Sequence, residues 1–204
     1  DKSVPGNYTV NKSGKRFANE SQNYLTFMRE VLRKQEQGES FTPMYMIFDS
    51  NHRKNYPVGP LMPGKFFPDP LVKFVHRNWF NDDFITRANS IQELAQKTGI
   101  NPDGLEDTIQ KVNKFSETGK DIDFQRGDNE RDRFSGDQSL INPCLGPVNQ
   151  APYYAMRIDP GEFATCGGMA INEYGQVLNN DNQAIGGLYA TGNCTPALLT
   201  TYPG

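Results

Sequence analysis

The spacing of hydrophobic residues changes twice within the first fifty positions and predicts three elements. A short alternating run around a turn-forming stretch predicts a β-hairpin within residues 4–20. Apolar residues then recur at helical spacing over 25–32, and they predict a helix that ends near Gln37. The unbroken apolar run at 44–48, closed by Asp49, is typical of a buried strand.

Two adjoining helices are expected in the middle of the chain. Ser90 and Glu93 have the spacing of a capping box, and they open a helix that ends at Gly99. Asn101 caps the second helix, with Pro102 at its first position. The residues of this helix expected to face the core are Leu105, Ile109, Val112 and Phe115.

Two other segments show no clean hydrophobic period. Residues 51–82 contain five prolines, and we interpret them as a long irregular excursion. Residues 118–148 are polar and loop-like. Their charged cluster, Arg126–Arg133, is interpreted as a solvated surface or as a salt-bridge network on a lid.

From residue 153 onward the pattern becomes strand-like. Strand candidates lie at 153–158, 167–178 and 186–192, with a turn at 179–182. With helices in the middle and strands at both ends, the pattern predicts an α+β region inserted into a larger sheet protein. Neither end resembles a natural terminus, and we expect the chain to be a piece of a longer protein.

Composition and charge narrow the classes of function. The 204 residues predict one or two domains, and a net charge of −3 argues against a nucleic-acid-binding surface. No apolar run is long enough to span a membrane. Cys144, Cys166 and Cys194 form no CxxC pair, and we interpret them as buried free thiols in a reducing compartment.

Common catalytic motifs are missing from the sequence. His52 and His76 are isolated, and no HExxH motif, P-loop or GxSxG elbow occurs, so neither a metal site nor a serine nucleophile is expected. The nine tyrosines remain as acid or base candidates. The run Gly186–Asn193 allows a cofactor to approach the backbone closely, or it is an ordinary strand-to-loop transition. The pair Gly167-Gly168 leaves the same two interpretations open.

Several longer motifs resemble one enzyme family. GLYATGN at 187–193 and APYYAMRIDPGEFATCGGMAINEYGQVL at 151–178 resemble flavoproteins of the succinate dehydrogenase/fumarate reductase superfamily, as does VNKSGKRFANES at 10–21. Within that superfamily, four further stretches resemble the 3-ketosteroid Δ1-dehydrogenases. They are NESQNY at 19–24, MYMIFDS at 44–50, DFQRGDNERDRFSGD at 123–137 and TTYPG at 200–204.

The resemblance implies an α+β fold and a division of the chain. Residues 1–160 would be a substrate-capping catalytic domain, inserted into an FAD-binding Rossmann-like α/β domain. Residues 161–204 would be the C-terminal strands of that FAD-binding domain, which is incomplete at both ends. The implied cofactor is FAD, and the implied substrate is a 3-ketosteroid. The electron acceptor is left open, and neither nucleic acid nor metal is expected.

The resemblance also implies roles for individual residues. Tyr24 would remove the C2 proton of the steroid, and the hydroxyl of Tyr202 would hydrogen-bond the C3 ketone. Leu198 and Leu199 would join Tyr202 in binding the substrate. The implied cofactor-binding residues are Gly167, Gly168, Tyr189, Ala190, Gly192 and Asn193.

Departures from the family pattern keep alternatives open. Cys166 stands where lysine is common, Pro196–Leu199 replaces a run of smaller residues, and Phe134 stands where tyrosine is frequent. The alternatives are a 3-ketosteroid Δ4-dehydrogenase, a fumarate reductase-like flavoprotein, or an inactive steroid-binding remnant. We expect a cytoplasmic protein and leave association with a membrane open.

Overall fold

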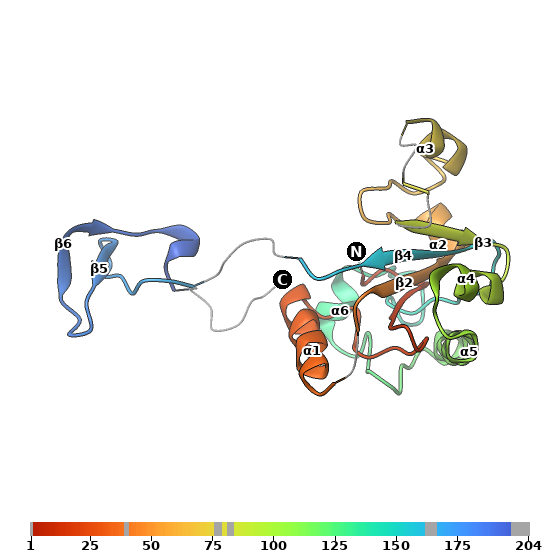
Figure 1. Ribbon diagram of the computed structural model, residues 1–204, viewed down its shortest axis with the longest axis horizontal. Coiled ribbons are helices and arrows are strands. Elements are labelled where there is room, and N and C mark those ends of the chain that lie inside the picture. The colour runs from red at the N-terminus through yellow and green to blue at the C-terminus, as the bar shows by residue number, and fades with distance from the viewer. Residues whose placement is uncertain (1, 39–40, 76–78, 81–83, 162–166, 197–204) are drawn as a thin grey trace. The chain divides into compact units, whose positions relative to one another are not determined.

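The computed structural model describes residues 2–38, 41–75, 79–80, 84–161 and 167–196 (Figure 1). The chain divides into two compact units, which we call unit 1, Asp1–Asp159, and unit 2, Pro160–Gly204.

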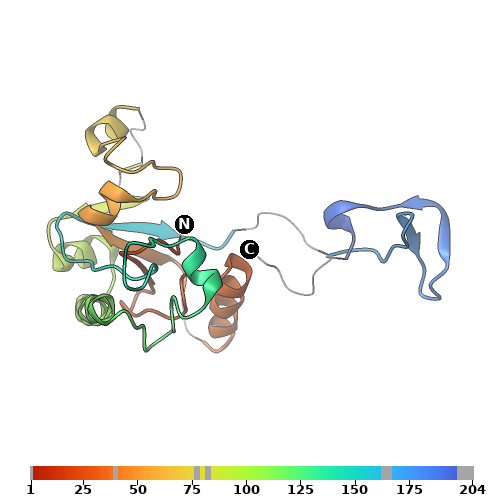
Figure 2. The ribbon, with the colours of Figure 1, turned by 180° about the vertical axis from the view of Figure 1, so that it is seen from behind.

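Unit 1 is built on a four-stranded antiparallel sheet with the strand order β1-β2-β4-β3 (Figures 1 and 2). Its strands are β1 (Asn7–Val10), β2 (Met44–Asp49), β3 (Ile85–Ala88) and β4 (Tyr153–Ile158). The strands predicted at 44–48 and 153–158 are therefore confirmed. A single bridge between Val10 and Arg16 closes the N-terminal hairpin.

Six helices accompany this sheet among the described residues. They are α1 (Tyr24–Glu36), α2 (Ser50–Asn55), α3 (Asp69–Val75), α4 (Ile91–Thr98), α5 (Pro102–Thr118) and α6 (Glu130–Phe134). The predicted capping residues act as expected, because Ser90 Oγ accepts a hydrogen bond from Glu93 N and the Asn101 side chain accepts one from Gly104 N. Gly99 ends α4 in the left-handed conformation.

The alternation of side chains along β2 explains why this strand is apolar from Met44 to Phe48. Tyr45 and Ile47 belong to the core cluster that includes the inward residues of α4 and α5. Met46 and Phe48 belong to a second cluster, which includes Val72 of α3. Because successive side chains of a strand point to opposite faces, a central strand covered on both faces is expected to carry a continuous apolar run.

A third buried cluster holds α1 in place. Phe27 and Val31, four residues apart on α1, pack with Phe17 and Phe41. The rings of Phe17 and Phe41 meet edge-on with their centroids 4.9 Å apart.

The expectation of an irregular excursion at 51–82 is wrong in part. α2 and α3 lie within it, although both are short and neither carries a full amphipathic period. α2 begins where Asp49 accepts a hydrogen bond from His52 N, and the second residue of α3 is Pro70, a position that needs no N–H donor. The prolines therefore lie between helices or at a helix start.

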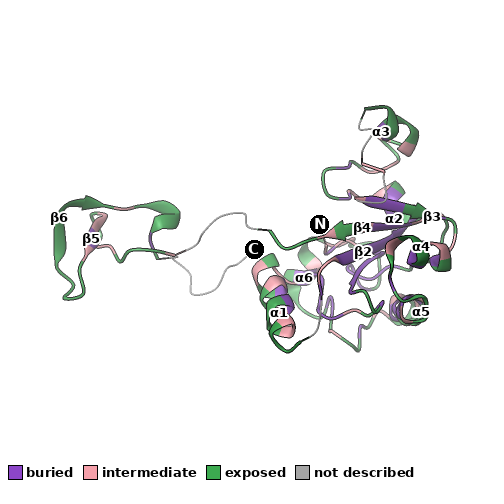
Figure 3. Ribbon diagram, in the orientation of Figure 1, coloured by how far each residue is buried: buried purple, intermediate pink, exposed green. Residues whose placement is uncertain are grey.

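Unit 2 contains an antiparallel pair of strands, β5 (Gln176–Leu178) and β6 (Ala184–Tyr189), followed by the 3₁₀ helix η1 (Gly192–Cys194). The turn predicted at 179–182 is confirmed, since Asn182 N donates to Asn179 O. Figure 3 shows how little of this unit is buried. Among its described residues only Val177 and Thr195 are buried, and β6 is exposed along its whole length.

Candidate functional site

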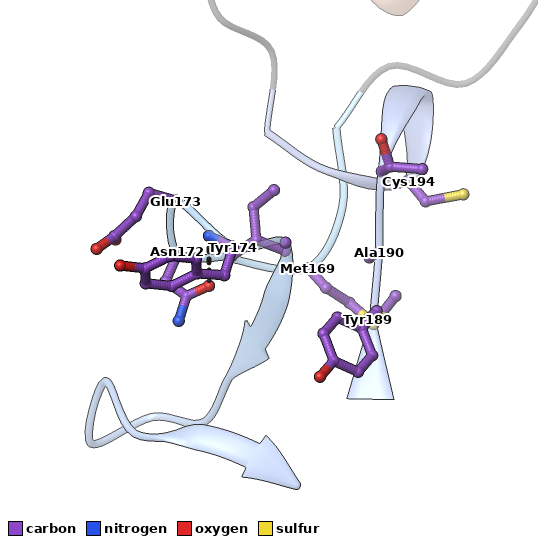
Figure 4. Close-up of a pocket in the computed structure, with 10 residues that line it drawn as sticks. Met169, Asn172, Glu173, Tyr174, Tyr189, Ala190 and Cys194 are labelled. Atoms are coloured by element: carbon purple, nitrogen blue, oxygen red, sulfur yellow. Dashed lines mark hydrogen bonds between the residues drawn. The ribbon is translucent and has the colours of Figure 1, made fainter. Parts of the chain in front are cut away.

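A groove in unit 2 is lined by two of the residues predicted to bind the cofactor (Figure 4). Its volume is about 730 Å³. The labelled residues that line it include Met169, Asn172, Tyr174, Tyr189, Ala190 and Cys194. Tyr189 and Ala190 were predicted from the sequence, so the glycine-rich segment does border a groove.

Backbone contacts hold the two walls of the groove together. Met169 N donates to Cys194 O over 3.0 Å, and Ala190 N donates to Gly175 O over 3.0 Å. A Cβ at Gly168 would collide with the carbonyl of Cys194, so this crossing of two chain segments requires glycine. Gly168 is thus needed for the close approach of the segments that form the groove.

A turn centred on Asn172 shapes one wall. The side-chain oxygen of Asn172 accepts hydrogen bonds from Tyr174 N, at 3.1 Å, and from Gln176 N, at 3.0 Å. An Asn side chain that bonds the backbone two residues ahead is a common way to fix a tight turn. The result is that the exposed ring of Tyr174 is presented at the groove, where Figure 4 shows it together with Tyr189.

The other predicted cofactor residues adjoin this groove in sequence. Gly192 and Asn193 lie in η1, and Gly192 has a φ of 64°, in the left-handed region that favours glycine. Gly167 precedes the crossing at Gly168. Tyr202, Leu198 and Leu199, predicted to bind substrate, lie outside the described residues.

Tyr24, the predicted base, is the first residue of α1 in unit 1. The preceding residue, Asn23, caps the helix by accepting a hydrogen bond from Thr26 N at 2.9 Å. The side chain of Tyr24 is 47% exposed. Its position is therefore fixed by the helix start, while much of its ring remains accessible to a ligand.

A buried ionic network lies immediately before Tyr24. Glu20 is fully buried and receives two hydrogen bonds from Arg16, from Nε and Nη2, each of 2.8 Å. Arg16 Nη2 also donates to Asp121 over 2.7 Å. Such a bidentate pair fixes geometry as well as charge, so the chain leading into α1 is anchored three residues before its cap.

Arg126 belongs to the same network. Of the two interpretations of the Arg126–Arg133 cluster, the solvated surface is wrong at this residue, whereas Arg126 does form a salt bridge, with Glu20. Arg126 is fully buried and donates to the carbonyls of Asn7 and Lys2, each over 2.6 Å, and to Ser21 Oγ over 3.1 Å. A run of charged residues does not reveal which of them is buried. Residues 19–21 and 126–132 are joined by hydrogen bonds from Asn19 to Asp132 and from Arg126 to Ser21. Both stretches lie within motifs that resemble the same family, and this was the signal that the sequence offered.

Within this network, the charged forms of Glu20 and Arg16 are favoured. Burial alone would raise the pKa of Glu20, but Arg16 and Arg126 outweigh burial and hold it below its usual value. Burial alone would lower the pKa of Arg16, yet Glu20 and Asp121 raise it. Both guanidinium groups also lie about 5 Å from the ring of Tyr8, at 5.1 Å and 5.0 Å.

Two further expectations concern thiols and metals. Cys144 is buried as predicted, Cys194 is exposed contrary to the prediction, and Cys166 lies outside the described residues. Searching the residues that the structure describes reveals no group of three or more His, Cys, Asp or Glu side chains able to hold a metal ion. Likewise, no helix in the described ranges is long and apolar enough to cross a membrane.

Two curated dehydrogenases are similar to this chain along nearly its whole length. The chain is 36% identical to the 3-oxosteroid 1-dehydrogenase of Mycolicibacterium smegmatis, over 100% of the chain and 36% of that protein. It is also 36% identical to the 4-oxocyclohexanecarboxylate 2-dehydrogenase of Sinomonas cyclohexanicum, over 98% of the chain and 33% of that protein. The chain thus spans about a third of the length of these relatives.

A solved structure gives the same result. The 3-ketosteroid Δ1-dehydrogenase of Sterolibacterium denitrificans, in complex with 1,4-androstadiene-3,17-dione, matches with a TM-score of 0.86 and 36% identity. The match covers 96% of this chain and 34% of that one. The resemblance deduced from the sequence motifs is confirmed. The FAD binding domain family model matches residues 3–204, so the chain belongs to this family of FAD-binding proteins.

Proposed function

We propose that the complete protein introduces a C1–C2 double bond into ring A of 3-ketosteroids, with FAD as its cofactor. The observation that carries this proposal is the 36% identity to a 3-oxosteroid 1-dehydrogenase along the entire chain. In this proposal unit 1 is the substrate-capping catalytic domain, and unit 2 is part of the FAD-binding domain into which it is inserted. We place the reaction in the cytoplasm.

The residues of unit 2 fit a flavin. A flavin ring needs a flat apolar surface beside accessible backbone, and β6 leaves Ile185, Leu188 and Tyr189 exposed ahead of Gly192. Tyr189, Ala190, Gly192 and Asn193 would hold the cofactor from one side, and Gly167 and Gly168 from the other. Bound FAD would supply the acceptor for the hydride that leaves C1.

Tyr24 would take the C2 proton. A C–H bond next to a ketone becomes acidic when the negative charge that develops on the ketone oxygen is stabilised. A free tyrosine has a pKa of about 10, so a base of this kind needs surroundings that favour the phenolate or a route for its proton. Tyr24 opens α1, where the positive end of the helix dipole favours negative charge.

Tyr202 would polarise the C3 ketone by donating a hydrogen bond from its hydroxyl. Leu198 and Leu199 would supply apolar surface for the steroid next to it. The steroid would lose a proton from C2 to Tyr24 and a hydride from C1. Together these two losses leave a C1–C2 double bond.

The test uses the complete protein, purified with its flavin and mixed anaerobically with a 3-keto-4-ene steroid. We expect the flavin absorbance to bleach and a 1,4-diene to form. Tyr24→Phe should slow bleaching about a hundredfold or more, whereas the strand variant Tyr153→Phe should retain most of the rate. Bleaching that survives both Tyr24→Phe and Tyr202→Phe would contradict the proposed roles. Steroid binding without bleaching would indicate a binding protein.

One relative supports a second candidate substrate. The 4-oxocyclohexanecarboxylate 2-dehydrogenase is as similar to this chain as the steroid enzyme is. Its name indicates the same kind of reaction, removal of hydrogen next to a ring ketone, on a small substrate. Bleaching by 4-oxocyclohexanecarboxylate but not by any steroid would favour this candidate and would keep the proton-abstracting role of Tyr24.

A further inference from the structure

The chain that leads into α1 is held by a distant segment of unit 1. Asn19 Nδ2 donates a hydrogen bond of 2.8 Å to the carboxylate of Asp132, and the two residues are 113 positions apart. Asp132 belongs to α6, which lies near the N-terminal end of α1 in Figures 1 and 2. The start of α1, where Tyr24 is the first residue, therefore depends on a long-range contact as well as on its own cap.

The carboxylate of Asp132 has a fixed place. Asp132 is 1% exposed, and the oxygen that accepts from Asn19 also accepts a hydrogen bond of 3.1 Å from Gly127 N. Gly127 has a φ of 83°, and a Cβ there would collide with the side chain of Asn142, so this turn requires glycine. Asn142 Nδ2 in turn donates to Arg126 O over 3.1 Å. Asp132 is thus part of a buried, hydrogen-bonded frame.

Asn19 connects this frame to Tyr24. Asn19 is 5% exposed, and while its Nδ2 bonds Asp132, its Oδ1 accepts a hydrogen bond of 2.8 Å from Ser21 N. An Asn side chain that bonds the backbone two residues ahead fixes a tight turn. Asn23, the cap of α1, follows this turn closely, so the geometry of the turn sets where the helix begins.

Core packing alone does not define the position of Tyr24 closely enough for proton transfer. Phe27 and Val31 bury one side of α1, but burial of apolar surface is non-directional, so it selects the buried side without setting the first residue of the helix. A catalytic base has to come within about 3 Å of the proton that it removes. A misplacement of about 1 Å can slow a reaction about a hundredfold. Hydrogen bonds are directional, so the contacts of Asn19 and Asp132 can supply this precision.

We propose that Asp132 and Asn19 are positioning residues for Tyr24. This inference rests on the proposed function, in which Tyr24 takes the C2 proton of the substrate. Asp132 holds Asn19, the turn at Asn19 sets the start of α1, and α1 presents the hydroxyl of Tyr24 to the substrate. Because both residues act through Tyr24, their loss should slow proton abstraction and leave substrate affinity unchanged.

The test measures the rate at which a saturating 3-keto-4-ene steroid reduces the flavin of the complete protein. Asp132→Ala removes the acceptor of the Asn19 amide and should lower this rate about tenfold to a hundredfold, while the steroid dissociation constant changes by about twofold or less. Asp132→Asn keeps an acceptor oxygen and should recover most of the rate. In the Tyr24→Phe background Asp132→Ala should have almost no further effect, because it acts through the lost hydroxyl. A merely structural role would lower the rate by the same factor in both backgrounds.

Leu94→Ala is the matched control. Leu94 is fully buried in the core cluster around α4 and α5, whereas α1 packs in the third cluster. Its loss should lower the melting temperature but change the rate of flavin reduction by about twofold or less. Flavin content and melting temperature show whether each variant is folded. If Asp132→Ala does not fold, Asn19→Ala removes the donor of the same hydrogen bond and takes its place in both backgrounds.

Hydrogen exchange at the first turn of α1 separates this inference from the proposed function, since it is measured without substrate. Asp132→Ala should speed exchange at the amides of Thr26 and Phe27 about tenfold, and Leu94→Ala should not. Unchanged exchange at these amides, or the same loss of rate with and without the Tyr24 hydroxyl, would overturn the positioning role. If no steroid reduces the flavin of the unaltered protein, the proposed function fails, and the exchange measurement decides the positioning role.

Discussion

Units 1 and 2 differ most in how they bury apolar side chains. Unit 1 has three buried clusters around one sheet, and both faces of β2 are covered. Among the described residues of unit 2, Val177 is the one buried hydrophobic residue, while Ile185, Leu188 and Tyr189 of β6 are exposed. Two strands alone do not bury enough surface for independent stability.

This difference indicates which interactions stabilise each unit. Unit 1 is specified by its own sequence, through packing and the buried Arg16–Glu20–Arg126 network. Unit 2 is held by backbone crossings such as Met169 to Cys194, and it leaves its apolar strand available for other contacts. A binding segment of this kind gains stability from whatever it binds.

The largest effect is expected from Arg126→Met. This change removes the Arg126 donor from the carbonyls of Lys2 and Asn7 and a charge partner from the buried Glu20. Removing one partner of a buried ion pair costs about 3–5 kcal/mol. Hydrogen exchange of the β2 amides in the complete protein should therefore speed up about a hundredfold or more, if β2 opens with the global unfolding of unit 1.

Arg33→Met is the matched control for Arg126→Met. Arg33 forms its ion pair with Glu30 on the solvent side of α1, where such pairs contribute about 1 kcal/mol or less. Equal exchange rates in the two variants would contradict the idea that unit 1 depends on the buried network. Exchange in β6 should respond weakly to either change.

Much of unit 1 could be predicted because its elements carry local signals. The caps at Ser90 and Asn101 and the apolar run of β2 each have a physical cause within a few residues. The burial of Arg126 could not be predicted, because its partners lie about 120 residues earlier in the chain. α2 was missed for another reason, since a six-residue helix with one cap has no period to detect.

The candidate site was predictable only in part, and for a similar reason. The glycine-rich segment around Tyr189 indicated backbone access, and it does border a groove. Its composition alone left this segment open between a cofactor site and a plain loop, and the longer motifs favoured the cofactor site through the family resemblance. The anchoring of Tyr24 by Glu20 was not foreseen, since a buried carboxylate looks the same as an exposed one in a sequence.

Acid should reveal a second difference between the units, since both histidines of the chain lie in unit 1. Burial lowers the pKa of His52 to about 4, and its Nδ1 lies 2.7 Å from the carbonyl of Pro5. Between pH 6.5 and 4 the unfolded state binds a proton at this side chain and the folded state does not. Stability therefore falls as pH falls through this range, by about 3 kcal/mol in all.

Urea unfolding at a series of pH values tests this prediction, with His52→Gln as the comparison. The variant should lose less stability between pH 6.5 and 4.5. Glu20 does not contribute to the loss of stability in this pH range. Its pKa is lowered on folding, so its contribution to stability is lost only below its unfolded pKa, near 4.5. Parallel profiles for the two proteins would mean that His52 is not held neutral.

The smallest effect is expected at Gly168, and it is confined to unit 2. In Gly168→Ala the new methyl group meets the carbonyl of Cys194, so the two walls of the groove must move apart at a cost of about 1–3 kcal/mol. If this groove holds the flavin, the FAD dissociation constant should rise between about fivefold and a hundredfold. Hydrogen exchange of the β2 amides should stay unchanged. Gly161→Ala, whose methyl group would meet nothing within 4 Å, should bind FAD normally. Normal FAD affinity in Gly168→Ala would mean that the close crossing at Cys194 does not shape the cofactor site. A change in the hydrogen exchange of the β2 amides would mean that the two units are not stabilised independently.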